Sequence, residues 1–299
     1  MIAEGPLTGL MGIRISRFCV ACTLAVALVL VGCGTKGTSE ETTTASVPAG
    51  APVDPSTAGT IRGKVELDGT PPARRPLNMG AAEKCAQQRT TPGMTEDVVP
   101  GDNGTLQNVV VYLKGDFSKY SFPNATTPVA LRQSGCVFEP HVVALMTGQP
   151  LQVSNSDPMT HNINGGATKN NKRWNDSQPA NGATTEETFA KEEVAFPVKC
   201  NVHPWMKAYI AVVATPYFQV TGQDGSFELK NVPPGTYTVM AWQETYGTEE
   251  QTVTIGPNEN KEATLTFKAA ATSKQSQAPA DLREVEAQAF LTRGPGLHF

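Results

Sequence analysis

The sequence predicts an all-β protein, and three observations carry that prediction. Beyond residue 60, Val, Thr, Gly and Pro dominate, and apolar residues rarely recur with the period of a helix. Short runs such as 61–67 and 236–242 instead alternate apolar with other residues, as half-buried strands do. Turn signals such as Asp-Gly and Pro-Pro-Gly separate these runs. At 299 residues the chain is long enough for two small β domains with appendages.

The N-terminus has the features of a targeting segment. Arg14 and Arg17 precede an apolar run at 19–31, as in a secretory signal. The run ends Leu30-Val31-Gly32-Cys33, which resembles a bacterial lipobox and implies that Cys33 is lipidated. Because the run is shorter than the about 20 apolar residues of a membrane-spanning helix, a lipoprotein signal is favoured over a transmembrane anchor. We therefore expect residues 1–32 to be removed. The mature protein would be exported and lipid-anchored to the cell envelope, facing the periplasm or the exterior.

The remaining cysteines can be sorted by their expected roles. The chain has six, of which two leave with the signal and Cys33 carries the lipid. In an oxidising compartment the simplest arrangement is a disulfide between Cys85 and Cys136, which leaves Cys200 as a single thiol. Bound metal would protect such a thiol, so this arithmetic favours Cys200 as a metal ligand.

The strongest chemical signal is the segment Cys200-Asn201-Val202-His203-Pro204-Trp205-Met206. Strand-like runs at 193–198 and 208–213 flank it, so it is expected to form a tight loop. A further histidine, His161, follows the strand-like run 150–154. One thiolate, two imidazoles and one thioether are the ligands of a blue, type 1 copper centre.

The order of motifs around this loop resembles the cupredoxin family, and the loop itself resembles that of amicyanin. The matching motifs in residues 129–215 are Phe138-Glu139-Pro140, Gly148-Gln149-Pro150, Asn155-Ser156-Asp157 and His161-Asn162. The resemblance implies a Greek-key β-sandwich over 126–215 that binds one copper ion. Its ligands would be His161, Cys200 and His203 around the metal, with Met206 in the axial position.

The same resemblance implies roles for the residues beside the ligands. Asn162 would tie the two ligand loops together. His203 would present one edge to solvent, and Pro204 with Trp205 would form an apolar docking patch next to it.

Each proposed ligand also has an ordinary structural explanation. A free Cys is a common core residue, and a Met usually fills space. The thioether of Met206 nevertheless favours copper over zinc, which rarely takes such a ligand. For His141 a structural role is favoured. The alternative roles are a second metal contact, part of a copper-loading site, or a surface residue. Met146 and Met159 are expected to serve core packing.

A second resemblance covers the region after the loop. The run D-G-x-F-x-x-x-x-V-P-P-G-x-Y at 224–237 resembles the transthyretin-like, carboxypeptidase regulatory-like β-sandwich. That family opens with a G-x-V strand like the one at 61–67, far upstream. We therefore expect a sandwich split into 59–125 and 216–268, with the cupredoxin inserted at 126–215. Tandem domains are the alternative. Asp224-Gly225 also predicts a β-hairpin.

The remaining segments are expected to lack a core. Residues 33–58 are rich in Thr, Ser, Ala, Pro and Gly and would form a flexible linker after the lipidated cysteine. Residues 269–299 are expected to be a tail, with one short helix at 281–291.

These observations favour a copper-binding electron-transfer lipoprotein that is not an enzyme. The net charge of −4 argues against nucleic acid as a partner, and no catalytic constellation is visible in the sequence. The expected partners are a redox protein, not identified by the sequence, and the membrane through the lipid anchor. The alternatives are a lipoprotein that stores or delivers copper, and a structural or carbohydrate-binding β protein without metal.

Overall fold

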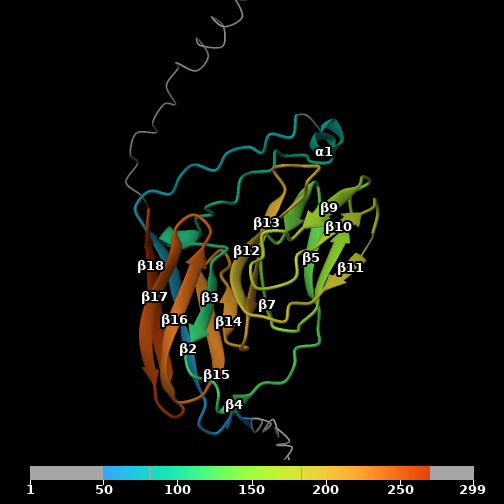
Figure 1. The fold of residues 1–299 in the computed structure, drawn as a ribbon. Helices are drawn as coiled ribbons and strands as arrows, with labels where there is room; N and C mark the ends of the chain where they lie inside the picture. Colours follow the sequence, from blue (N-terminus) through green and yellow to red (C-terminus); the bar gives the residue numbers. More distant parts are fainter. Residues whose placement is uncertain (1–49, 81, 183, 270–299) are drawn as a thin grey trace, which may run out of the picture. The chain divides into compact units, whose positions relative to one another are not determined.

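The computed structural model describes residues 50–80, 82–182 and 184–269, and the chain is all-β in these ranges, as predicted (Figure 1). Its two helices are short: α1 (Glu83–Gln87) and the 3-10 helix η1 (Asp102–Gly104). The predicted signal, the lipidation site Cys33, most of the linker and the tail lie outside the described residues. Within the described ranges, no helix is both long and apolar enough to cross a membrane.

The first sandwich pairs a four-stranded sheet, in the order β14-β3-β16-β17, with a three-stranded sheet, β15-β2-β18. The strands are β2 (Gly59–Asp68), β3 (Val110–Lys114), β14 (Phe218–Val220), β15 (Ser226–Val232), β16 (Gly235–Gln243), β17 (Gly247–Ile255) and β18 (Asn260–Lys268). These strands come from both sides of the segment that forms the second sandwich. Because β2 pairs with both β15 and β18, the chain leaves this sandwich and later returns to it.

The second sandwich pairs a five-stranded sheet, β10-β9-β12-β13-β7, with a four-stranded sheet, β11-β8-β5-β6. The strands are β5 (Val129–Ser134), β6 (Val137–Glu139), β7 (Val142–Met146), β8 (Leu151–Asn155), β9 (His161–Asn164), β10 (Asn175–Gln178), β11 (Thr184–Glu187), β12 (Glu193–Lys199) and β13 (Lys207–Val213). The antiparallel pair β12 and β13 flanks the 200–206 loop, so the two strands predicted around that loop are both present.

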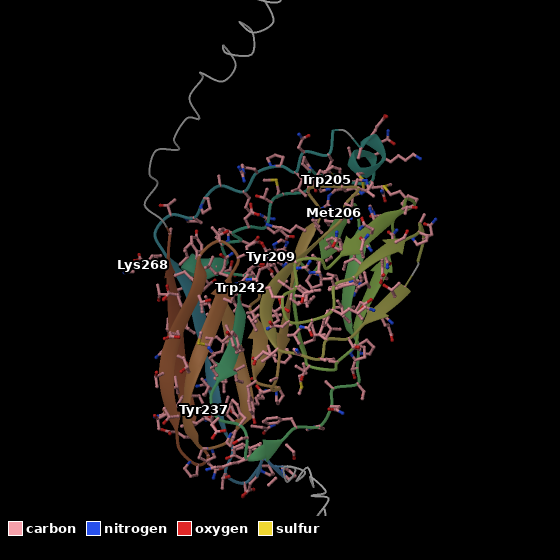
Figure 2. All side chains as sticks on the ribbon, in the orientation of Figure 1. Trp205, Met206, Tyr209, Tyr237, Trp242 and Lys268 are labelled. Carbon is pink, nitrogen blue, oxygen red and sulfur yellow. A yellow bond between two sulfur atoms is a disulfide. The ribbon has the colours of Figure 1, made fainter. Side chains whose placement is uncertain are left out.

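Two strands are apolar on both faces because they separate two cores. Val111 and Leu113 of β3 lie in the core of the first sandwich, whereas Val110 and Tyr112 lie in a cluster that also contains Val213 of β13. In β13, residues 208, 210 and 212 face the core of the second sandwich. Continuous apolar runs are typical of strands buried on both faces. The contact between these sheets also includes Tyr209 and Trp242, whose ring centroids are 5.1 Å apart (Figure 2).

Two local expectations differ from the structure. The Asp224-Gly225 turn does not close a hairpin, because β14 pairs with β3 whereas β15 pairs with β2 in the other sheet. Gly225 has φ +66°, and a Cβ there would lie 2.5 Å from Cβ of Thr105, so this turn needs a glycine at a crossing between sheets. In addition, the end of the expected linker is ordered: β1 (Ala51–Pro52) pairs in parallel with β4 (Tyr120–Ser121).

Residues 73–97, here called the arm, leave the first sandwich and contact the second (Figure 1). The two halves of the arm run side by side, since Leu77 N donates to Gly93 O at 2.7 Å and Thr95 N donates to Arg75 O at 2.8 Å. Helix α1 lies between these halves, and its Cys85 is joined to Cys136 by a disulfide. The arm is therefore covalently attached to the turn between β5 and β6.

Candidate metal centre

The proposed ligands come from two strands and one short loop of the second sandwich. Cys200 follows β12 directly, and His161 is the first residue of β9. The loop between β12 and β13 is closed by its own backbone: Cys200 N donates to Met206 O at 3.1 Å, and Met206 N donates to His203 O at 2.9 Å. Because the C-x-x-H-x-x-M spacing is short, these two bonds and the β12–β13 ladder hold the whole loop in one conformation.

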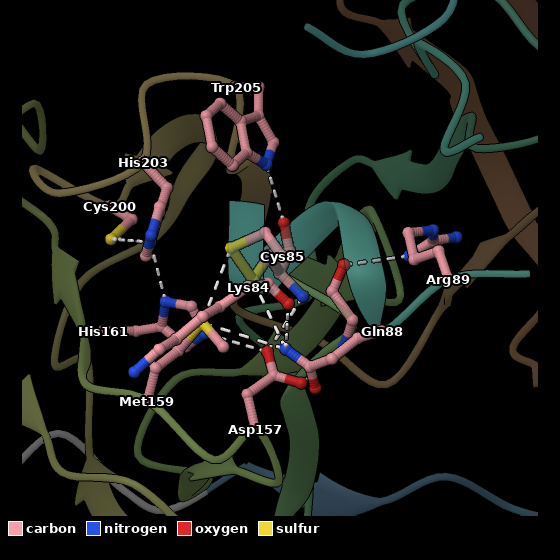
Figure 3. The surroundings of a disulfide bond; sticks show 12 residues. Lys84, Cys85, Gln88, Arg89, Asp157, Met159, His161, Cys200, His203 and Trp205 are labelled. Carbon is pink, nitrogen blue, oxygen red and sulfur yellow. Dashed lines mark hydrogen bonds and ion pairs between the residues drawn. A yellow bond between two sulfur atoms is a disulfide. The ribbon is translucent and has the colours of Figure 1, made fainter. Parts of the chain in front are cut away.

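Three of the four proposed ligands converge in space (Figure 3). Nδ1 of His161 lies 2.9 Å from Nδ1 of His203, and Sγ of Cys200 lies 3.8 Å from the same atom of His203. All three side chains are buried, and their donor atoms lie within 4.8 Å of one another. Two donors of one ion, each about 2.0–2.3 Å from it, stand about 3–4 Å apart. The three donors therefore fit a single metal ion.

The fourth proposed ligand, Met206, is fully buried in the same hydrophobic cluster as Cys200. Its backbone bonds to both Cys200 and His203, as described above, so its position in the loop is fixed. Thiolate, imidazole and thioether donors together favour copper over harder cations.

Asp157 orients the imidazole of His161, a role that the sequence did not reveal. Its Oδ2 lies 2.8 Å from Nε2 of His161, and its carboxylate also accepts backbone N–H bonds from Gly135 at 2.6 Å and Cys136 at 2.8 Å. Nδ1 of His161 is thereby directed at His203. Carboxylates bound to the second nitrogen of a histidine commonly fix metal ligands in this way. In the sequence, only the four-residue spacing from His161 could have pointed to Asp157, and that spacing is common by chance.

Asn162 and Pro204, the two residues expected to lie beside the ligands, have different surroundings. Oδ1 of Asn162 accepts the backbone N–H of Asn201 at 2.7 Å and lies 3.3 Å from Sγ of Cys200. Asn162 thus connects the strand that bears His161 to the loop that bears Cys200. Pro204 is exposed and lines a pocket of about 450 Å³ together with Trp205.

The electrostatics of the protein alone favour the ligand form of Cys200. Burial opposes the thiolate, but hydrogen bonds from His161 and from the 162 and 203 positions lower the pKa of Cys200 below its usual value. Burial, followed by the positive charge of His161, lowers the pKa of His203 and keeps that ring neutral. Burial also opposes charge on His161, but its bonds to Asp157 and Cys200 raise its pKa to about 9. A metal ion held by His161 would therefore have to displace a proton from this ring.

The expectation that His203 presents an edge to solvent is wrong. Its side chain is buried, with a relative exposure of 7%. The two disulfide sulfurs lie within 4.8 Å of a ring nitrogen of His203 (Figure 3). The Trp205 ring lies 5.2 Å from the His203 ring, and its Nε1 donates to Cys136 O at 2.9 Å. Cys85 of the arm thus lies against this proposed ligand, and nothing in the local sequence of the loop indicates that contact.

The other histidine and methionine candidates lie outside the three-donor cluster. His141 is buried and binds Glu244 through Nε2, with Glu96 at 3.8 Å from Nδ1. This places His141 in the contact between the two sandwiches, in agreement with a structural role. Met146 is buried in β7. Met159 is half-buried, and its Sδ contacts both sulfurs of the disulfide, at 3.5 Å from Cys85 and 3.4 Å from Cys136.

Comparison with known proteins gives one family match and several structural likenesses. The carboxypeptidase regulatory-like domain matches residues 203–268, which include β13–β18. No curated protein matches the sequence. The solved structures include a copper-containing nitrite reductase from Thermus scotoductus, 21% identical, with a TM-score of 0.28. The match covers 33% of this chain and 25% of that chain.

Two smaller proteins are also similar to part of the chain. A reduced amicyanin in which one tryptophan is replaced by tyrosine is 16% identical, with a TM-score of 0.26, over 28% of this chain and 81% of that chain. A purple cupredoxin from Nitrosopumilus maritimus is 20% identical, with a TM-score of 0.24, over 28% of this chain and 98% of that chain. The match thus covers a quarter of the nitrite reductase chain and most of the amicyanin and purple cupredoxin chains.

Proposed function

We propose that this chain is a one-copper electron-transfer protein, exported and tethered to the cell envelope by lipid on Cys33. The observation that carries the proposal is the convergence of His161, Cys200 and His203 donor atoms in a buried site. Met206 supplies the axial thioether from the same loop. In this site copper would exchange one electron at a time between its two common oxidation states.

The surroundings of the ligands support electron transfer because they limit movement. Asp157 fixes the ring of His161, and Asn162 fixes the loop next to Cys200. The ligand loop is further closed by its own backbone bonds. A frame that resists rearrangement keeps the two oxidation states similar in geometry, so little reorganisation opposes the transfer of an electron. A protein that releases its metal to a partner would benefit from a looser frame.

Because the side chain of His203 is buried, electrons need another route between the proposed copper site and the surface. Val202, beside it, is 59% exposed and is the large hydrophobic residue most open to solvent in the described ranges. Pro204 is also exposed, and Trp205 is half-buried. We propose that a redox protein docks on this apolar tip and receives the electron through the 200–206 loop, rather than through an exposed histidine edge. The regulatory-like sandwich would act as a spacer between the membrane and this docking site.

The test is copper reconstitution of the purified protein. Added Cu(II) should give intense visible absorption from the Cys200 thiolate, the EPR spectrum of a type 1 site, and reversible one-electron cycling at one copper per chain. Cys200→Ser should remove the visible band while the protein remains folded. The control variant is Ser177→Ala. It changes a residue of β10 outside the proposed ligand set and should leave the visible absorption band intact.

Two results would contradict the proposal. A wild-type protein that stays colourless with one equivalent of Cu(II) would exclude the type 1 site. Copper that binds only as Cu(I) and passes to a chelator without reversible cycling would favour storage or delivery instead.

A further inference from the structure

The described part of the molecule contains a second group of sulfur atoms that the copper site does not use. Cys85 and Cys136 form the disulfide, and Sδ of Met159 lies 3.5 and 3.4 Å from their sulfurs (Figure 3). Both cysteines are fully buried, and Met159 is half-buried. Two cysteine sulfurs and a thioether thus meet at one point beneath α1. A simple structural disulfide needs no thioether against both of its sulfurs.

We propose that this sulfur cluster, Cys85, Cys136 and Met159, becomes a second Cu(I) site when the disulfide is reduced. Soft thiolate and thioether ligands select Cu(I). Three sulfur ligands of one ion, each about 2.3 Å from it, stand about 4 Å apart. Met159 is already close to that separation from both cysteines, so mainly the two cysteine sulfurs must move apart.

The chemistry balances with a dithiol reductant. The dithiol gives two electrons and two protons to the disulfide and becomes a disulfide itself, so that Cys85 and Cys136 each carry a thiol. Cu(I) then replaces the two thiol protons and accepts the Met159 thioether as the third ligand. Neither step changes the oxidation state of the copper, and the resulting centre carries one negative charge.

The groups around the sulfur cluster suit this charge. Nε2 of Gln88 faces two of the sulfurs, 3.9 Å from Cys136 and 3.8 Å from Met159. Arg89, the next residue, donates Nη1 of its guanidinium to Gly135 O at 3.1 Å, and its buried Nε has no hydrogen-bond partner among the described residues. The carboxylate of Asp157 is the opposing charge, and it is bound by His161 and two backbone N–H groups.

Two pockets lie beside the residues that surround the cluster, although none of the three sulfur-bearing residues lines either pocket. A pocket of about 310 Å³ is lined by residues of the arm that include Met79, Ala86 and Arg89. A second pocket, of about 340 Å³, is lined by Gln88, Arg89 and Asp157 among others. Ala86 of α1 lines the first pocket, and Gln88 and Arg89, which follow α1, line the second, so opening of this short element would bring solvent to the sulfurs.

The test compares Cu(I) binding by the oxidised and the reduced protein. The purified chain is reduced with dithiothreitol, freed of it without air, and titrated with Cu(I) against a coloured Cu(I) chelator. We expect one tightly bound Cu(I) in the oxidised protein and two in the reduced protein. The double variant Cys85→Ser/Cys136→Ser should bind one in both states. Cys200→Ser, which removes a ligand of the first site, should gain one tight Cu(I) on reduction.

Met159→Leu keeps the disulfide and therefore tests the site even if the double variant fails to fold. The affinity of the reduced protein for its second Cu(I) should fall by at least about tenfold, with the first Cu(I) unaffected. Met146→Leu, in β7 and away from the sulfurs, is the matched control and should leave both affinities unchanged. The proposal is overturned if reduction adds no Cu(I) to the wild type. It is equally overturned if Met159→Leu binds the second ion as tightly as Met146→Leu does.

Discussion

The carboxylate of Asp157 accepts hydrogen bonds from His161, Gly135 and Cys136, so one residue joins a proposed metal ligand to the turn that carries the disulfide. Asp157→Asn should weaken copper binding by about 10–100-fold because His161 is less firmly oriented. It should also raise the reduction potential, since a negative charge near the metal favours Cu(II). Copper titration and voltammetry measure the two effects.

A control separates these effects from a general change in charge. Asp116→Asn removes an exposed carboxylate from the first sandwich, and it should change neither affinity nor potential measurably. If Asp157→Asn behaves like Asp116→Asn, then Asp157 does not position the ligand.

Met206 should set the potential rather than hold the metal. Met206→Gln replaces a soft thioether with a harder oxygen, which stabilises Cu(II), so the copper should remain bound and the potential should fall. Voltammetry and the EPR spectrum of the variant check this result. An unchanged potential would mean that the sulfur of Met206 is not an axial ligand.

The candidate ligand residues could be proposed from the sequence because the information is local. Cys200, His203 and Met206 fall within one short loop, whose flanking strands are visible in the apolar pattern. The role of Asp157 was not predicted because its four-residue spacing from His161 is common by chance and its other hydrogen bonds come from the distant residues 135 and 136. The cover over His203 could not be predicted because it depends on Cys85 and Cys136, which lie far away in the chain.

At the scale of the elements, the position of helix α1 depends on one covalent bond, the Cys85–Cys136 disulfide. It has five residues and no side-chain cap, and Cys85 is its one buried residue. Isolated helices of this length are not stable in water. We therefore expect the disulfide to hold the middle of the arm against the second sandwich.

Limited trypsin digestion tests this dependence. Lys84 is exposed and Arg89 is half-buried, and both lie in or next to α1. Loss of a disulfide costs about 2–5 kcal/mol, so local opening and cleavage at these sites should be more than about tenfold faster in the reduced protein. Mass spectrometry identifies the fragments. Cleavage at Lys230, in β15, serves as the control and should not change; equal rates at Lys84 in both redox states would contradict the prediction.

Apolar patterns in the sequence predicted the strands more reliably than turn residues predicted which strands pair. The continuous apolar run at 109–113 is typical of a buried strand, and its residues lie in β3 and just before it, divided between two hydrophobic cores. Asp224-Gly225 correctly marked a turn but wrongly predicted a hairpin. The same two residues suit any tight reversal with a positive φ, and only distant pairing with β2 decides which sheet the next strand joins.

At the scale of the whole described molecule, a group of charges accompanies the apolar contact between the two sandwiches; His141 and Glu244 are buried, whereas Lys207 and Asp97 are partly exposed. Glu244, the residue after β16, binds His141 through one oxygen and Lys207 through the other, the latter at 2.6 Å. Asp97 of the arm lies 3.2 Å from the same Lys207. Three chain segments therefore meet at Glu244, next to β13, the strand that follows the 200–206 loop.

Replacing Glu244 should destabilise the protein without removing any proposed ligand. Glu244→Gln leaves the buried His141 without its carboxylate partner and weakens the hold on Lys207, so the free energy of unfolding should fall by about 3–5 kcal/mol near pH 7. Chemical denaturation measures the change. Glu249→Gln, on the exposed face of β17, is the matched control, and a surface substitution of this kind changes stability by no more than about 0.5 kcal/mol.

The pH dependence of stability tests whether the negative charge of Glu244 causes the loss of stability expected in Glu244→Gln. Burial raises the pKa of Glu244, but hydrogen bonds from His141 and Lys207 outweigh it and hold the pKa below the usual value. A carboxylate with a lowered pKa in the folded state contributes stability above its unfolded pKa, about 4.3. That contribution is lost as the pH falls through the folded pKa. The difference in stability between wild type and Glu244→Gln should therefore be constant near neutral pH and shrink in acid below about pH 4. A difference that stays constant down to acid unfolding would show that packing, rather than charge, makes Glu244 important to the contact between the sandwiches.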